Sequence, residues 1–544
     1  MGRTGAPSKA CQTCKTRKIK CDEGKPSCYQ CVKTSRVCPG YSDVIFRNQT
    51  EAVKRKQQLP KKQRPQSKAF NARLPKSAEC DEESSGTSTA LVRRRQSFTS
   101  DDVSRELKSR FGQLRVYSSS ESIRPPPWLS IQEQAVNICF KNFDTMYGVG
   151  YDDGHNILHA LAPLYQASSE GSPLRVSLHA VALSALSMLS SKRILQHQAA
   201  LAYGKAIKTM STALLDTTFA QKDETLLAAL VLSWYETINA SDGSMRAWSS
   251  HIDGAAAILK MRGSSQFHDP LGLVLFRQVR TEMFINCLRS GTAPEDFPEQ
   301  GGWLSDTHLG TYDYRDPVHD LMHHAVELPT LLQIQKEIMR HAPDTEALSD
   351  MQALVGRARQ VEKAMADTKL PDEFRPRTIG YIADLPEDID TATAWVGPVY
   401  DYRDVYVASA LNKIHSCRIL AAKIMTTGIM WMYPVGYSQK EEYRHATYIQ
   451  QRATDEICSS VPLHFRWGKR NGEHLNSSDE EMNHTVDLVV GYLLHWPLRV
   501  ARTSDEISTE QKRWIDRQLN NVGERCGVRQ ATVFEVEEDQ AAIS

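Results

Sequence analysis

From residue 128 to the end of the chain, apolar residues recur with the period of an α-helix. Spacings of i, i+3, i+4 and i+7 place such residues on one side of a helix, where they can pack into a core. The clearest examples are Leu227, Leu230, Val231 and Trp234; Ile252, Ala255, Ala256 and Leu259; and Ile515, Leu519 and Val522. Alternating patterns typical of strands are scarce. We therefore predict a large all-α domain over residues 128–544.

The periodic pattern is missing between residues 46 and 127, which are rich in Lys, Arg, Gln, Ser and Pro. This composition predicts a basic, mostly disordered linker. Within it the segment KRKQQLPKKQRP is typical of a nuclear localisation signal, and a non-specific DNA-clamping arm is the alternative interpretation. The basic residues of the segment are Lys54, Arg55, Lys56, Lys61, Lys62 and Arg64.

Positive charge is concentrated at the N-terminal end, although the whole chain has a net charge of only +1. Residues 1–70 contain 17 Lys and Arg against 4 Asp and Glu, whereas the remainder contains 49 against 61. Lys and Arg neutralise phosphates and release counterions, so the basic end is where DNA would bind. The acidic remainder is expected to have another role.

The chain shows no signal for membrane insertion or secretion. Its longest candidate, LLAALVLSWY at residues 226–235, is about half of the roughly 20 residues that a membrane span needs. The first residues also lack the apolar core of a secretory signal. A soluble intracellular protein is therefore expected. Cysteines stay reduced in that environment, so a cysteine cluster there is more typical of metal binding than of disulfides.

Six cysteines between residues 11 and 38 form the strongest motif. The spacing C-x2-C-x6-C occurs twice, and the second copy is displaced by 17 residues. In each copy the first two thiols fit the first turn of a short helix, and the third returns from an extended segment. Each half therefore offers three ligands, whereas a closed structural zinc site takes four.

A two-zinc cluster solves this shortage, because six thiolates fill eight coordination positions when two of them bridge both metals. By pseudo-twofold symmetry the bridges are the first cysteine of each half, Cys11 and Cys28. The first metal would bind Cys11, Cys14, Cys21 and Cys28, and the second would bind Cys28, Cys31, Cys38 and Cys11. The other six cysteines are scattered singly and are expected to be core residues.

Residues 11–38 resemble the binuclear zinc cluster of fungal transcription factors. The match covers the six cysteines, the basic segment KTRKIK, the following Asp22 and the turn residue Pro26. The resemblance implies two zinc ions per chain and recognition of CGG triplets in double-stranded DNA. It places base reading on Lys18, whose ammonium group would reach the O6 and N7 acceptors of guanine. Lys15, Arg17 and Lys20 would contact phosphates or buttress the helix.

Three later segments, residues 247–263, 405–425 and 493–531, are similar to the fungal-specific transcription factor domain that accompanies this cluster. The chain is thus identified as a nuclear regulator of RNA polymerase II genes, and regulation of a metabolic or secondary-metabolite pathway is one candidate role. We expect a homodimer and contacts with the transcription machinery or co-regulators. We expect no membrane as a partner. The acidic and apolar tail, residues 534–544, has a composition found in activation segments, with a DNA-bound repressor as the alternative.

An enzyme is the rival class of function. The segment HDLMH places His319 and His323 on one helix face, with Glu327 one turn further on, an arrangement similar to the H-E-x-x-H motif of zinc hydrolases. In this chain Asp320 stands where that motif has Glu, and its shorter carboxylate would reach a zinc-bound water poorly. We therefore expect a polar helix face here and no enzyme.

Overall fold

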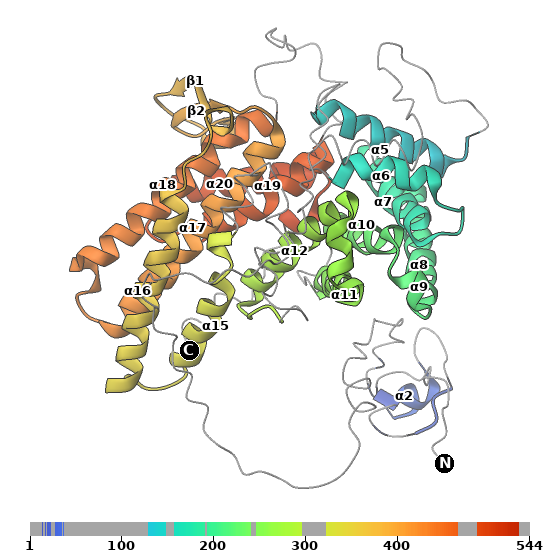
Figure 1. Cartoon of the computed structure of the whole chain (residues 1–544), viewed down its shortest axis with the longest axis horizontal. Coiled ribbons are helices and arrows are strands. Elements are labelled where there is room, and N and C mark those ends of the chain that lie inside the picture. Colours follow the sequence, from blue (N-terminus) through green and yellow to red (C-terminus); the bar gives the residue numbers. More distant parts are fainter. Residues whose placement is uncertain are drawn as a thin grey trace, which may run out of the picture. The chain divides into compact units, whose positions relative to one another are not determined.

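The computed structural model describes two compact units, Met1–Val92 and Arg93–Ser544 (Figure 1). The described residues are 13–14, 17, 19–22, 28–34, 36 and 38 in the first unit, and 129–147, 157–190, 193–240, 246–295, 323–465 and 487–532 in the second. The predicted linker at 46–127 and its localisation signal lie outside these residues.

The N-terminal unit contains a short helical turn at residues 13–14 and the helix α2 (Tyr29–Lys33). The predicted pair of short helical segments, one in each half of the cysteine repeat, is therefore present. Cys28 precedes α2 in extended conformation, and Thr34 ends the helix.

The first half of the second unit is a layered group of helices. Its central helix, α7, contacts α5, α8 and α10, while α11 packs between α10 and α12. The helices are α5 (Ile131–Tyr147), α6 (Ile157–Ala167), α7 (Pro173–Ser190), α8 (Arg193–Ala213), α9 (Thr217–Ala220), α10 (Asp223–Asn239), α11 (Arg246–Arg262) and α12 (Pro270–Ser290), with the 3-10 turn η1 (Gly263–His268) after α11.

The second half is built around the long helix α17, which contacts α15, α16, α18 and α19. Its helices are α15 (Leu328–Ile338), α16 (Thr345–Asp367), α17 (Val405–Met432), α18 (Glu441–His464), α19 (Asp487–Arg502) and α20 (Thr509–Arg525). Short 3-10 turns are η3 (Asp372–Phe374), η4 (Ile389–Thr391), η5 (Tyr437–Gln439) and η7 (Arg529–Ala531).

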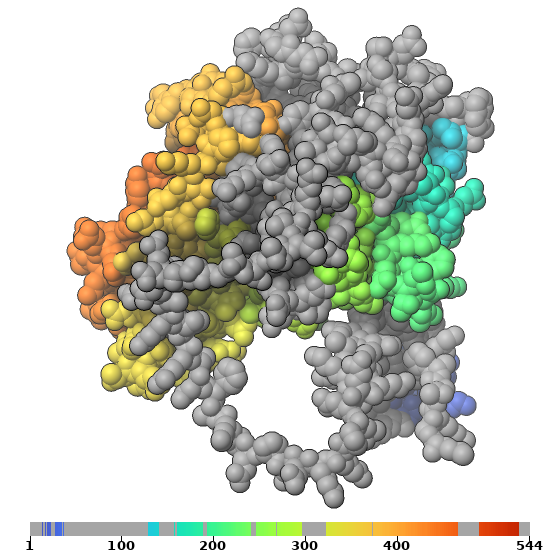
Figure 2. Space-filling model, in the orientation of Figure 1, coloured from blue at the N-terminus to red at the C-terminus, as the bar shows by residue number. Residues whose placement is uncertain are grey.

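One antiparallel hairpin departs from the all-α pattern within the described residues. Strand β1 (Arg377–Ile382) pairs with β2 (Gly397–Asp401), and the register shifts between Thr378 and Gly380. The hairpin lies at the surface of the unit (Figure 2). Almost all of β1 is exposed, including Ile379 and Tyr381, so the strand does not have the buried apolar face of a half-buried strand.

Side-chain caps fix the starts of several helices. Before α5, Ser130 and Glu133 form a reciprocal capping box: the Glu133 amide donates to the Ser130 hydroxyl at 3.2 Å, and the Ser130 amide donates to the Glu133 carboxylate at 3.0 Å. Asp344 and Asp404 likewise accept from backbone amides in the first turns of α16 and α17. Within the described residues, these caps fix where α5, α16 and α17 begin.

The predicted apolar stripes lie in the core. Leu227, Leu230 and Val231 on α10 are fully buried, as are Ile515, Leu519 and Val522 on α20; on α11, Ile252, Ala255 and Leu259 are fully buried and Ala256 is 7% exposed. Trp234 is partly buried against the same core. Trp496 on α19 packs against three hydrophobic clusters, so it joins the two halves of the unit. This confirms the prediction of a large helical domain.

No helix among the described residues is long and apolar enough to cross a membrane.

Candidate zinc centre and DNA-contact residues

The structure describes seven of the sixteen predicted site residues. The cysteines Cys14, Cys21, Cys28, Cys31 and Cys38 and the basic residues Arg17 and Lys20 are among them. Cys11, Lys15 and Lys18 lie outside the described residues, as do the six basic residues of the predicted localisation signal.

Three thiols from both halves of the repeat converge at the centre of the module. The Sγ atoms of Cys14, Cys28 and Cys31 all lie within 4.8 Å of one another, and all three residues are fully buried. The distance between the Cys14 and Cys28 sulfurs is 3.7 Å. Two thiolates on one tetrahedral zinc, each at about 2.3 Å, lie about 3.8 Å apart. The thiols are therefore spaced as zinc ligands.

Cys28 has a particular position among these ligands. It belongs to the group with Cys14 and Cys31, and also to a second group with Cys21 and Asp22. Cys28 therefore lies near thiols of both halves of the repeat, Cys14 and Cys21 in the first and Cys31 in the second. The same residue opens α2, so its sulfur is placed by the start of the second helix.

The 17-residue repeat seen in the cysteine spacing is also present in the backbone. In the first half the Ile19 amide donates to the Cys14 carbonyl at 3.1 Å. In the second half the Arg36 amide donates to the Cys31 carbonyl at 3.0 Å. The two bonds join equivalent positions, so each half closes its helical turn in the same way.

Asp22 connects the two halves. Its carboxylate accepts from the backbone amides of Tyr29 at 2.9 Å and Gln30 at 3.2 Å, the first residues of α2. These amides have no partner within the helix, so the aspartate satisfies them and complements the positive helix end. In the sequence Asp22 is part of the motif, but the motif alone gives it no role. The only sequence signal for this contact was the position of Asp22 directly after a ligand cysteine.

Arg17 also crosses between the halves. Its guanidinium donates to the Thr34 hydroxyl at 3.2 Å, and that hydroxyl donates to the Gln30 carbonyl at 2.8 Å. Arg17 thus contacts the residue that ends α2, a buttressing contact of the kind expected for this group of residues. Lys20 is exposed to solvent.

Basic charge is unequal between the two halves. Residues 15–20 (KTRKIK) occupy the repeat positions of residues 32–37 (VKTSRV), and they contain four basic residues against two. The halves share a backbone pattern but not a charge pattern. A polyanion would therefore be attracted more strongly to the first half.

Two residues of the rival hydrolase motif, His323 and Glu327, are among the described residues. Both carboxylate oxygens of Glu327 accept from the Arg357 guanidinium, one of them from Nε at 2.7 Å. This ion pair gives Glu327 a partner on α16. His323 is described and lies beside His324, whereas His319 and Asp320 lie outside the described residues.

Five of the scattered cysteines are core residues, as predicted. Cys139, Cys287, Cys417, Cys458 and Cys526 are all buried, and Cys80 lies outside the described residues. Burial raises the pKa of Cys139 and of Cys417 to about 12. Such thiols stay protonated at neutral pH, which makes them poor metal ligands and poor nucleophiles.

Two family models match the chain. The fungal Zn(2)-Cys(6) binuclear cluster domain matches residues 9–46, and the fungal specific transcription factor domain matches residues 151–287, from before α6 to the end of α12. The first of these domains binds two zinc ions through six cysteines, the number that the repeat provides.

Curated relatives agree with these matches. "Transcription factor dbaG" of Emericella nidulans is 20% identical over 416 residues, which are 74% of this chain and 91% of that protein. "Transcription activator AMTR1" of Alternaria alternata is 52% identical over 42 residues, 8% of this chain and 6% of that protein. "Transcriptional regulatory protein moc3" of Schizosaccharomyces pombe is 61% identical over 31 residues, 6% of each chain. No solved structure matches the chain significantly.

Proposed function

Because this chain is a fungal zinc cluster transcription factor, we propose that its N-terminal module binds CGG triplets in the major groove of DNA. In this proposal residues 1–45 form the DNA-binding domain, residues 46–127 a basic linker, and residues 128–544 a helical regulatory domain. The chain is a DNA-binding regulator of transcription that holds two zinc ions. What we propose is the CGG triplet, the residues that read it and the domain boundaries of the chain.

The unequal charge of the two cluster halves carries the proposal. Six thiolates and two zinc ions have a net charge of −2, so the cluster alone would repel phosphate. The four basic residues of 15–20 offset more of this charge on the first half than the two basic residues of 32–37 do on the second. Since Arg17 is held by Thr34 and Lys20 is exposed, we assign Arg17 to supporting the module and Lys20 to phosphate. Lys15 is assigned to phosphate and Lys18 to the guanine edge.

We propose the ligand sets Cys11, Cys14, Cys21 and Cys28 for one zinc and Cys28, Cys31, Cys38 and Cys11 for the other. The supporting observation is that Cys28 lies near Cys14 and Cys21 of the first set and near Cys31 of the second. The zinc ions would hold together two halves that share almost no other core, because the buried apolar residues of the described module are its cysteines.

Selection of binding sites from random duplexes tests the triplet. We expect the purified full-length chain to enrich sequences with CGG. A K33A/R36A double variant is the control, because it removes the basic residues of the second half and should enrich the same triplet. Enrichment of another triplet, or of no sequence at all, would contradict CGG recognition.

Nuclear localisation through residues 54–65 also belongs to the proposal. A fluorescent fusion that lacks this basic segment should shift toward the cytoplasm, because the longest run of clustered basic charge outside the cluster is then gone. Deletion of residues 78–89, which has the same length and contains no Lys or Arg, is the matched control. The measurement is the ratio of nuclear to cytoplasmic fluorescence. Equal ratios for the two deletions would place the signal elsewhere.

The helical domain is proposed to act in regulation and not in catalysis. The ion pair between Glu327 and Arg357 engages the carboxylate that a hydrolase site would need. Homodimerisation and contacts with co-regulators are further parts of the proposal. Activation is favoured over repression, because the tail at residues 534–544 mixes acidic and apolar residues.

A further inference from the structure

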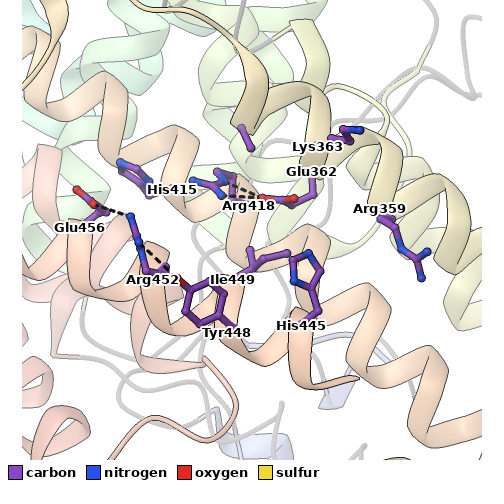
Figure 3. Close-up of a pocket in the computed structure, with 11 residues that line it drawn as sticks. Arg359, Glu362, Lys363, His415, Arg418, His445, Tyr448, Ile449, Arg452 and Glu456 are labelled. Carbon is purple, nitrogen blue, oxygen red and sulfur yellow. Dashed lines mark hydrogen bonds and ion pairs between the residues drawn. The ribbon is translucent and has the colours of Figure 1, made fainter. Parts of the chain in front are cut away.

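A cavity of about 410 Å³ lies between α16, α17 and α18, far along the chain from the zinc cluster (Figure 3). We name it the basic cavity. Its charged lining consists of Arg359, Glu362, Lys363, Arg418, Arg452 and Glu456. Its volume falls within the range of about 300–1,000 Å³ that is usual for small-molecule sites.

Three helical stripes build the basic cavity. On α16 the lining residues recur at positions 359, 362, 363 and 366; on α17 at 415 and 418; and on α18 at 445, 448, 449, 452 and 456. These are helical spacings of three and four, so each helix turns one face toward the same space. α17 packs against both of the other helices, which fixes the three faces relative to one another.

Positive charge exceeds negative charge in this lining. Glu362 is 7% exposed and pairs with Arg418, whose Nε donates to it at 2.9 Å. Glu456 lies 3.9 Å from Arg452. The four cations therefore face two carboxylates, and each carboxylate already has its own arginine.

The two remaining cations lie on α16. Arg359 pairs with Glu442, which is not part of the lining, at 2.7 Å across an exposed surface. Such exposed pairs contribute little free energy and exchange readily with a better partner. The Lys363 ammonium forms no ion pair with any of the residues that the structure describes. Both side chains are thus available to an anion.

The floor and one wall of the basic cavity offer neutral contacts. The Nδ1 atom of His415 is buried and has no hydrogen-bond partner among the described residues. Burial, together with Arg418 and Arg452, lowers the pKa of His415 to about 3, so its imidazole is neutral at physiological pH. Tyr448 and Ile449 add an aromatic and an aliphatic surface.

We propose that the basic cavity binds a small organic dianion, a dicarboxylate or a phosphate ester, with its charge on Arg359 and Lys363 and its uncharged body against Tyr448 and Ile449. An excess of two positive charges matches two negative ones. Arginine and lysine are the side chains that recognise carboxylate and phosphate oxygens. This site is separate from the residues proposed to bind DNA. The bound anion would act as an effector ligand of the helical domain.

Calorimetric titration of the full-length, zinc-loaded chain tests the proposal. The probes are succinate for a dicarboxylate and phenyl phosphate for a phosphate ester with an apolar body, and sodium chloride at equal ionic strength is the reference. An R359Q/K363Q double variant should bind the preferred probe at least about tenfold more weakly, which corresponds to about 1.4 kcal/mol, because it removes the charge-assisted hydrogen bonds of both side chains. The Arg359 side chain is 43% exposed and Lys363 is exposed, so folding should be unaffected, which the thermal midpoint checks.

The matched control is the double variant R444Q/K369Q, which removes the same charge from exposed residues near the same helices but outside the lining. It should bind as the unmodified chain does. Tighter binding of one probe over the other assigns the ligand to that class. Binding of neither probe, or an equal loss in both double variants, would overturn the proposal.

Discussion

Replacement of Cys28 by alanine should remove both zinc ions and unfold the N-terminal module. Cys28 lies near the ligands of both halves, and its sulfur is 3.7 Å from that of Cys14. Loss of a bridging thiolate leaves each metal with three protein ligands, whereas a closed zinc site needs four. Zinc binding supplies about 10–16 kcal/mol in comparable small modules, so a module without its metals has too little core to stay folded.

A comparison with Cys31→Ala tests the bridging role itself. Cys31 is equally buried, but it is assigned to one metal, so this variant should keep one zinc ion. Cys139→Ala, in the core of the helical domain, is the control and should keep both. The measurement is zinc per chain by mass spectrometry after dialysis. Equal zinc content in the Cys28 and Cys31 variants would contradict the assignment of Cys28 as a bridge.

The features that could be predicted from the sequence depend on short spacings. Leu227, Leu230 and Val231 are close together along the chain, and one helical turn is enough to place them on one face. The zinc cluster could be predicted for a similar reason, because the local repeat of C-x2-C-x6-C determines how many thiols each half offers. Both predictions needed only the period of local structure and the coordination number of zinc.

Contacts between distant segments could not be predicted in this way. Arg17 bonds to Thr34 across the module, and nothing near Arg17 in the sequence distinguishes it from the neighbouring lysines. The basic cavity is a similar case: Arg359, Arg418 and Arg452 are on three helices, and in each helix a single arginine resembles an ordinary solvated residue. Only the packing of α16, α17 and α18 brings the charges together.

The Lys18→Ala and Lys20→Ala variants should lose DNA affinity in different ways, although each substitution removes one positive charge. If Lys18 reaches the O6 and N7 acceptors of guanine, Lys18→Ala should lose about 1–3 kcal/mol on a CGG duplex and much less on a scrambled one. Lys20 is exposed and assigned to phosphate, so Lys20→Ala should weaken binding to both duplexes by similar factors. It should also reduce the slope of log K against log salt by about one unit.

Titration of each variant against both duplexes at several salt concentrations separates base reading from charge. Phosphate contacts do not depend on sequence, so a lysine that only neutralises charge cannot change the ratio of the two affinities. The ratio should therefore fall for Lys18→Ala and stay constant for Lys20→Ala. Zinc content must equal that of the unmodified chain, which excludes damage to the cluster as the cause. Parallel losses for both variants on both duplexes would mean that KTRKIK acts as a non-specific basic patch, and base reading would then have to come from outside this segment.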